Sequence, residues 1–254
     1  MYDFTFIKYR QLLETFKKYG WELLSVNHYN KNANKFVILR HDVDRFPNQT
    51  VQMAKLEKSL NVQSTYYFRT TKNVFKEDVI KQVINYGHDI GYHYEDLAKH
   101  YGNTEVAIKS FEINLNKIRN YYPVNSICMH GSPTSIYDNK KLWEKYNYKS
   151  YGIVLDTSLD IDYNSVFYIS DNGFGWNRTS TSIRDKINYG EKISIKSTDH
   201  LINLIKNNEL PQKIMLNAHP DTFFNPGFKW LLNYSFINSK NIIKWIVIKT
   251  GIIK

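Results

Sequence analysis

Short apolar segments typical of buried strands alternate with amphipathic helical segments along almost the whole chain. Residues 35–40 (KFVILR), for example, are rich in branched residues, whereas 104–122 place apolar residues at helical spacing. Such alternation favours parallel strands joined by helical crossovers. The sequence therefore predicts an α/β fold: one domain over 1–254, built as a distorted (β/α) barrel of about seven parallel strands. The expected strands are 35–40, 64–69, 88–94, 125–130, 151–156, 166–170 and 213–219.

Cysteine content and the N-terminal segment indicate where such a chain works. Cys128 is the single cysteine, which excludes an intrachain disulfide framework and fits a reducing compartment. The N-terminal segment MYDFTFIKYRQLL carries Asp3 and has no small-residue cleavage site, so we expect no secretory signal. The predicted location is the cytoplasm.

The positive charge does not by itself point to nucleic acid. Lysine and arginine number 34 against 24 acidic residues, a formal charge of +10, but they are dispersed and form no basic run of five. No nucleic-acid-binding signature is present, so we predict no nucleic-acid partner. Nor does any apolar run approach the roughly 20 residues of a membrane span. The C-terminal stretch 242–254 (IIKWIVIKTGIIK) could make peripheral contact with a membrane surface, although we favour a last element that closes the barrel.

Polar clusters recur where the predicted strands end. In parallel barrels this rim is where active sites are built, so clusters from separate strands can converge on one pocket. The clusters are 41–44 (HDVD), 88–95 (HDIGYHYE), 130–133 (HGSP), 156–158 (DTS) and 217–220 (NAHP).

Two of these clusters have the spacing of a cation site. Side chains alternate along a strand, so Asp42 and Asp44 share one face and His41 points to the other. Paired carboxylates repel unless they share a cation or a proton, although aspartates in this position could also cap a helix. His93 and Glu95 likewise share a face, and both are ligand types for divalent ions.

Histidines and turn residues complete the set of candidates. His130 precedes a Gly-Ser-Pro turn that would hold Ser132 and Pro133 at the pocket, where we expect them to contact substrate. His219 ends the last strand, and a neutral histidine at a rim can exchange a proton near neutral pH.

A further loop supplies candidate substrate contacts. Asp171 begins a glycine-containing stretch that ends at Trp176, and loops carry binding residues more often than cores do. The Trp176 ring could stack on a sugar ring, although packing in the core is an equally good interpretation.

These motifs resemble the NodB-homology polysaccharide deacetylases, the family 4 carbohydrate esterases. The similar segments are RHDVD, GHDIGYH, HGSP and IMLNAHP, in the family's order over about residues 36–220. The chain looks more closely like a branch that carries RHDVD, GYHYED, CMHGSP and a late AHP and is associated with surface-polysaccharide gene clusters. The resemblance implies a distorted (β/α) barrel and a metal-assisted deacetylase, with zinc as the expected ion.

The resemblance also implies roles for single residues. Asp42 would be the general base, Asp44 and His93 metal ligands, and His219 the general acid. The family's two aspartates are adjacent, whereas here Val43 separates them, so the roles of Asp42 and Asp44 are open to exchange.

Two other departures concern the metal ligands. The family's second metal histidine would fall on Leu97, and Glu95 or His130 could replace it, with Glu95 favoured on strand geometry. His130 also stands where the family has an arginine beside the catalytic aspartate, and could orient Asp42 or bind the ion.

The predicted function is hydrolysis of the carbon–nitrogen bond of an acetamido group on a sugar or polysaccharide intermediate, in surface-polysaccharide biosynthesis. Two alternatives remain open. One is a metal-independent, allantoinase-like amidohydrolase, and the other is a catalytically silent carbohydrate-binding member of the fold.

Overall fold

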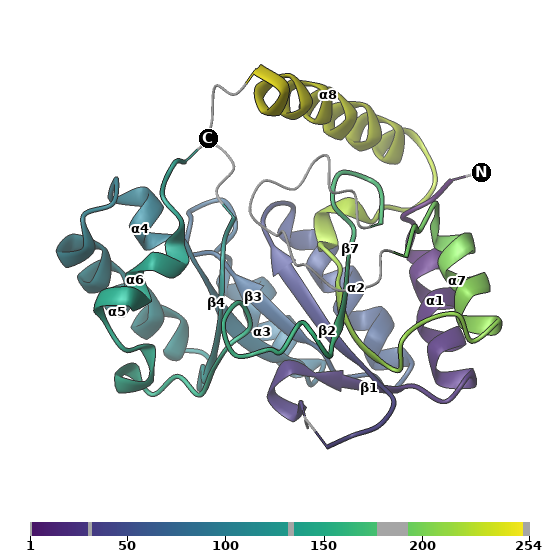
Figure 1. The fold of residues 1–254 in the computed structure, drawn as a ribbon, viewed down its shortest axis with the longest axis horizontal. Coiled ribbons are helices and arrows are strands. Elements are labelled where there is room, and N and C mark those ends of the chain that lie inside the picture. The colour runs from purple at the N-terminus through teal and green to yellow at the C-terminus, as the bar shows by residue number, and fades with distance from the viewer. Residues whose placement is uncertain (1, 30–31, 132–134, 177–192, 251–254) are drawn as a thin grey trace.

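The computed structural model describes residues 2–29, 32–131, 135–176 and 193–250, with the backbone alone for 243–250. One sheet of parallel strands forms its centre, in the order β6-β5-β4-β3-β2-β8-β7. Figure 1 shows the sheet curling between two groups of helices. The strands are β2 (Phe36–Val43), β3 (Thr65–Phe68), β4 (Asp89–Tyr94), β5 (Ser126–Met129), β6 (Leu155–Asp156), β7 (Phe167–Ser170) and β8 (Lys213–Asn217).

The predicted distorted barrel of about seven parallel strands is confirmed. Within the described ranges no backbone pairing joins β6 to β7, so the barrel is open on that side. One short strand, β1 (Glu22–Ser25), was not expected from the sequence. It pairs with the first half of β2, while β3 pairs with the second half, from Arg40 to Val43.

Helices cover the convex side of the sheet, as the helical spacing predicted. The α1 and α7 helices pack together, and α2 packs against α3 (Figure 1). The helices are α1 (Phe6–Lys18), α2 (Pro47–Ser59), α3 (Glu77–Asn85), α4 (Asp96–Lys99), α5 (Thr104–Arg119), α6 (Leu142–Lys145), α7 (Thr198–Lys206) and α8 (Phe228–Thr250), with 3₁₀ turns η1 (Val26–His28), η2 (Asn139–Lys141), η3 (Tyr148–Tyr151) and η4 (Pro220–Thr222).

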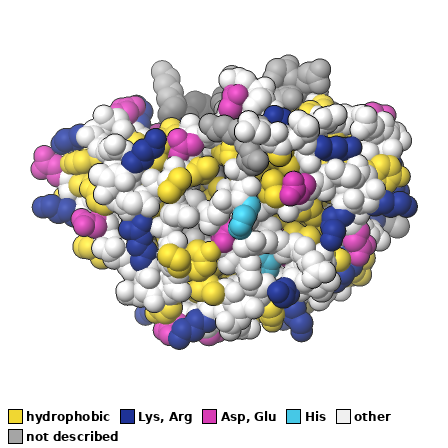
Figure 2. Space-filling model, turned by 90° about the horizontal axis from the view of Figure 1, so that it is seen from below, with side chains coloured by type: hydrophobic (Ala, Val, Ile, Leu, Met, Phe, Trp, Pro, Cys, Tyr) yellow, Lys and Arg dark blue, Asp and Glu magenta, His cyan; other side chains and the backbone are white. Residues whose placement is uncertain are grey.

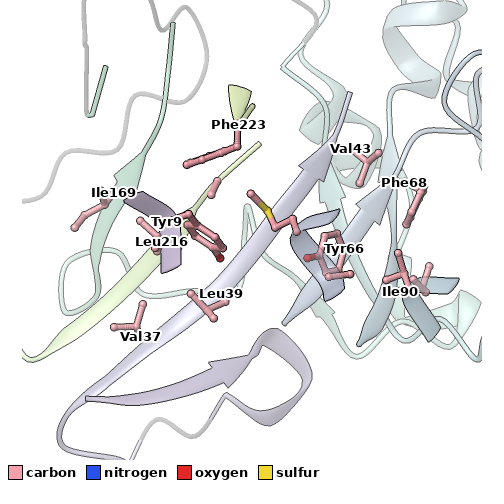
Figure 3. Close-up of a cluster of buried hydrophobic side chains, with 14 of the residues drawn as sticks. Tyr9, Val37, Leu39, Val43, Tyr66, Phe68, Ile90, Ile169, Leu216 and Phe223 are labelled. Carbon is pink, nitrogen blue, oxygen red and sulfur yellow. The ribbon is translucent and has the colours of Figure 1, made fainter. Parts of the chain in front are cut away.

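The central strand β2 is buried along its whole length, and its two faces meet different surroundings. Val37, Leu39 and Val43 face the helices and join the larger apolar core, part of which Figure 3 shows around Tyr9 and Tyr66. Phe36 and Ile38 point to the other face and form a smaller cluster inside the barrel; Tyr67, Cys128, Val166 and Met215 are among its other members. The side chains of Arg40 and Asp42 follow on this inner face.

On the face opposite to α8, basic side chains are spread rather than gathered. Figure 2 views the molecule from the side opposite to α8, and lysine and arginine side chains are scattered around that face. This agrees with the dispersal read from the sequence.

Candidate active site

Side chains from four strand ends meet at the carboxyl-terminal rim of the barrel. Asp42 comes from β2, Asp44 from the residue after β2, His93 from β4, His130 from the residue after β5, and His219 from the turn after β8. The predicted common face of the two aspartates is present, because the Nε2 atom of His93 lies 3.8 Å from Asp42 and 3.6 Å from Asp44.

Asp44 is the strongest indication of a cation site. Its Oδ1 atom is buried and accepts no hydrogen bond from the described residues. The Nε2 atoms of His93 and His130 lie 3.6 and 3.5 Å from it, and all three ligand atoms fall within 4.8 Å of one another. Burying a carboxylate oxygen without a partner costs free energy. One carboxylate and two imidazoles could meet that cost by holding a divalent ion.

His93 has the protonation state of a metal ligand. Its Nδ1 atom lies 3.1 Å from the carbonyl oxygen of Cys128, so Nδ1–H donates there and the Nε2 lone pair faces Asp44. Burial lowers the pKa of His93 to about 4, although Asp42 and Asp44 act in the opposite direction. The ring is therefore neutral at neutral pH, with one free nitrogen directed at the other ligands.

Glu95 does not occupy the position predicted for the third ligand. Arg69 donates to both of its carboxylate oxygens, at 3.1 and 2.7 Å, and Lys99 lies 2.9 Å away. Burial alone would raise the pKa of Glu95, but bonds from His130 and Arg69 hold it well below its ordinary value. The preference for Glu95 is corrected: strand alternation placed it on the right face but could not show that Arg69 would engage it.

His130, rather than Glu95, lies with Asp44 and His93 in a group that could hold an ion. Its Nδ1 atom lies 3.3 Å from Glu95, which leaves Nε2 turned toward Asp44. A carboxylate behind a ligating histidine fixes the ring and its tautomer, a frequent arrangement around metals. His130 thus reaches Asp44 rather than Asp42, contrary to the expectation that it could orient Asp42. Leu97, where the family pattern would place a histidine, is buried in the core.

Arg40 is the partner of Asp42 and was missed in the sequence. Its Nε and Nη2 atoms donate to the two carboxylate oxygens of Asp42 at 2.9 and 2.6 Å, and Asn217 adds a bond of 3.1 Å. Burial would raise the pKa of Asp42, but Arg40 and nearby histidines hold it far below its usual range. A signal did exist, because residues i and i+2 share a strand face and Arg40-His41-Asp42 has this spacing.

His219 is held in a fixed orientation by Asp171. Its Nδ1–H donates to Asp171 Oδ1 at 2.6 Å, and its backbone N–H donates to the other oxygen. Burial lowers the pKa of His219, but Asp171, with Asp42 and Asp44, outweighs this and raises it to about 10. The Nε2 atom lies 3.8 Å from Asp42. The expectation that Asp171 contacts substrate is corrected, because Asp171 is buried behind the His219 ring.

Trp176 is a core residue rather than a ring open to substrate. It is 2% exposed, its Nε1–H donates to Thr198 at 3.0 Å, and its ring lies 5.2 Å from that of Phe4. The prediction that it stacks on a sugar is therefore wrong, and core packing, the other interpretation, applies. Ser132 and Pro133 lie outside the described residues.

A second set of ligand types overlaps the first. Asp42, His93 and Cys128 also lie close enough to share an ion. Arg40 and Asn217 already occupy the Asp42 carboxylate, however, and burial raises the pKa of the Cys128 thiol well above its ordinary value. A protonated thiol is a poor ligand, so the geometry favours Asp44, His93 and His130.

The sequence matches no protein-family model. It also matches no curated protein. Among solved structures it is similar to a Streptococcus mutans family 4 carbohydrate esterase, at 15% identity over 87% of this chain and 84% of that one, with a TM-score of 0.49. It is also similar to a peptidoglycan N-acetylglucosamine deacetylase (18% identity, 96% and 93% covered, TM-score 0.42). The Bacillus subtilis peptidoglycan deacetylase PdaC is a third (12% identity, 87% and 99% covered, TM-score 0.40). Likeness of this degree does not by itself give the chain a family or an activity.

Proposed function

We propose that this chain is a hydrolase that removes the acetyl group from an acetamido sugar, with a divalent ion held by Asp44, His93 and His130. The observation that carries the proposal is the buried Oδ1 of Asp44, which accepts no hydrogen bond from any described residue and lies between two imidazole nitrogens. Three protein ligands of carboxylate and imidazole type leave a fourth position open, as in catalytic zinc sites, so zinc is the proposed ion. Surface-polysaccharide biosynthesis and a cytoplasmic location stay predictions from the sequence.

The two groups beside the ligand set have the protonation states that amide hydrolysis requires. When bound, the ion would polarise the acetyl carbonyl and acidify water. Asp42 is ionised, since its pKa lies far below neutrality, and it can accept the proton of the attacking water. His219 is protonated, since its pKa is about 10, and it can donate from Nε2 to the departing amine. Asp171 holds the ring so that this proton faces Asp42.

This arrangement also bears on the roles of the two aspartates. Asp44 lies between the two histidines, whereas Asp42 is engaged by Arg40 and lies 3.8 Å from His219. The structure supports Asp44 as ligand and Asp42 as base, and it gives no comparable support for the exchanged roles.

The experiment compares two leaving groups. The wild-type protein, loaded with zinc, should release acetate from members of a panel of N-acetylated sugars and should also hydrolyse p-nitrophenyl acetate. An amine departs only with a proton, whereas p-nitrophenolate departs without one. We therefore expect His219→Gln to lose about 10²–10⁴-fold on the amide and much less on the ester.

The control variant is Asp171→Asn, which keeps the His219 ring but removes the carboxylate behind it. It should lower amide hydrolysis about 10–100-fold, the range typical of a lost outer partner. It should also move the alkaline limb of the pH profile to lower pH, because Asp171 raises the pKa of His219. Equal losses on amide and ester would contradict the acid role, and a metal-free protein that still releases acetate would favour the metal-independent amidohydrolase.

A further inference from the structure

The outward face of the α8 helix exposes large apolar side chains that no described residue covers. Phe228, Leu231, Leu232 and Ile242 are 72%, 51%, 53% and 61% exposed. Their spacing places them on one side of the helix, since residues three, four and seven apart lie together. A contiguous apolar surface of this kind marks a site of interaction rather than an ordinary solvated face.

The opposite face of α8 is attached to the rim that carries the site. Asn233 donates to the backbone oxygen of Asp221 at 2.9 Å, and Trp230 donates to the backbone oxygen of Asp3 at 2.7 Å. Asp221 in turn accepts from Arg45, the residue after Asp44. Figure 1 shows α8 lying across the same end of the barrel. The exposed apolar face therefore points away from the molecule on the side where the active site is located.

The charged side chains from Thr222 to the last residue are all positive. No aspartate or glutamate occurs from Thr222 to the last residue, whereas five lysines do: Lys229, Lys240, Lys244, Lys249 and Lys254. Lys229 and Lys240 are exposed on the helix. An apolar face with flanking lysines and no acidic residue is complementary to the surface of an anionic bilayer.

We propose that α8 lies flat on an anionic membrane surface and that the proposed deacetylase acts there on a lipid-linked acetamido sugar. The substrate part of this inference rests on the proposed function. None of the described helices is long and apolar enough to cross a bilayer, and the proposal needs only contact in the plane of the interface. A second copy of this chain fits the face less well, because self-pairing would bring the lysines of two such helices together.

The test measures binding of the full chain to vesicles by flotation. We expect tight binding to vesicles of phosphatidylcholine mixed with phosphatidylglycerol and weak binding to phosphatidylcholine alone. Each lysine close to an anionic surface contributes about 1 kcal/mol, or roughly fivefold, so the two exposed lysines alone predict about a 25-fold difference. Added salt should reduce it.

The decisive variant carries Leu231→Glu and Leu232→Glu. It should bind anionic vesicles at least about tenfold more weakly, because two apolar contacts are replaced by negative charges. The matched control carries Val106→Glu and Ile113→Glu, which are 45% and 69% exposed on α5 away from α8 (Figure 1). The control should bind as the wild type does.

The outcomes separate this inference from the proposed function. Acetate release from a soluble acetamido sugar should be unchanged in the Leu231/Leu232 variant, so a loss of binding without a loss of turnover supports membrane docking. Equal binding to both vesicle types, or equal losses in the two variants, would overturn it whatever the enzyme activity. A wild-type dimer that becomes monomeric in the Leu231/Leu232 variant, without vesicle binding, would also overturn it and assign the face to a second copy.

Discussion

A buried carboxylate oxygen lies on each side of β2, and the two sides differ in how many hydrogen bonds that carboxylate accepts. On the inner face, Asp44 presents an oxygen that no described residue satisfies. On the helix-facing side, His41 pairs with Glu57 of α2 at 2.8 Å. Every oxygen of Glu57 is satisfied, since it also accepts from Tyr9, Ser64 and Tyr66 at 2.6–2.7 Å.

The difference lies in how completely each charge is matched. Both nitrogens of His41 lie against oxygen atoms, the Ala218 carbonyl and Glu57, at 2.8 Å. Burial would raise the pKa of Glu57, but His41 outweighs it and lowers the pKa to about 2. Breaking a fully matched buried pair leaves one charge without a partner and destabilises the fold, whereas an unmatched carboxylate at a rim is what a ligand-binding site leaves in the free protein. Burial alone does not distinguish a functional charge from a structural one.

Asp44→Asn, on the inner side of β2, should have the largest effect on zinc binding and activity. Loss of a charged ligand should abolish stoichiometric zinc binding and lower kcat/KM by about 10³-fold, several kcal/mol of transition-state stabilisation. The metal-free variant should unfold within about 1 kcal/mol of the metal-free wild type, because no described residue donates a hydrogen bond to Asp44 Oδ1. Elemental analysis and urea unfolding check both parts; zinc retained at one ion per chain would contradict the ligand assignment.

Glu57→Gln should lower stability and leave zinc binding unchanged, the reverse of Asp44→Asn. Removing one partner of a buried ion pair costs about 3–5 kcal/mol of unfolding free energy, while zinc binding by the folded variant should be retained. The pH dependence sharpens this prediction. The folded-state pKa of Glu57 is about 2 against an ordinary value of 4.5, so its contribution is present above pH 4.5 and is lost as the pH falls toward 2.

Urea unfolding between pH 2 and 5 measures that contribution as the difference between wild type and Glu57→Gln. Other carboxylates with lowered pKa values, such as Asp42, titrate in both proteins and cancel. A wild-type advantage that stays constant through this window would show that Glu57 does not carry the depressed pKa.

Trp176→Phe should have the smallest effect. It tests whether this ring contributes to stability or to substrate binding. The variant loses the bond from Nε1–H to Thr198, so we expect about 1 kcal/mol less stability and an unchanged KM. A raised KM with unchanged stability would return Trp176 to the substrate-binding residues.

The sequence predicted the sheet and the face of each rim residue better than it predicted their partners. Periodicity predicted the strands, and alternation placed Asp42 and Asp44 on one face of β2 and His41 on the other. The partner of each side chain depends on neighbouring strands and on rotamers, which the sequence does not give. Arg69, which follows β3, donates to Glu95, and His130 rather than Glu95 faces Asp44. Trp176 could not be placed from its loop, because its burial depends on Phe4 and Thr198, far away in sequence.

The alternation of charges along β2 has a consequence for how the chain finds its strand pairing. A slip of β2 by one residue exchanges its two faces. His41 would then enter the barrel, Glu57 would lose its buried histidine partner, and Arg40 and Asp42 would be driven into the apolar layer under the helices. Apolar residues occupy both faces of the lower half of this strand, so they discriminate poorly between the two alignments. The charged upper half disfavours the wrong alignment, because Glu57 would lose His41 and the Arg40–Asp42 pair would be buried away from Asn217.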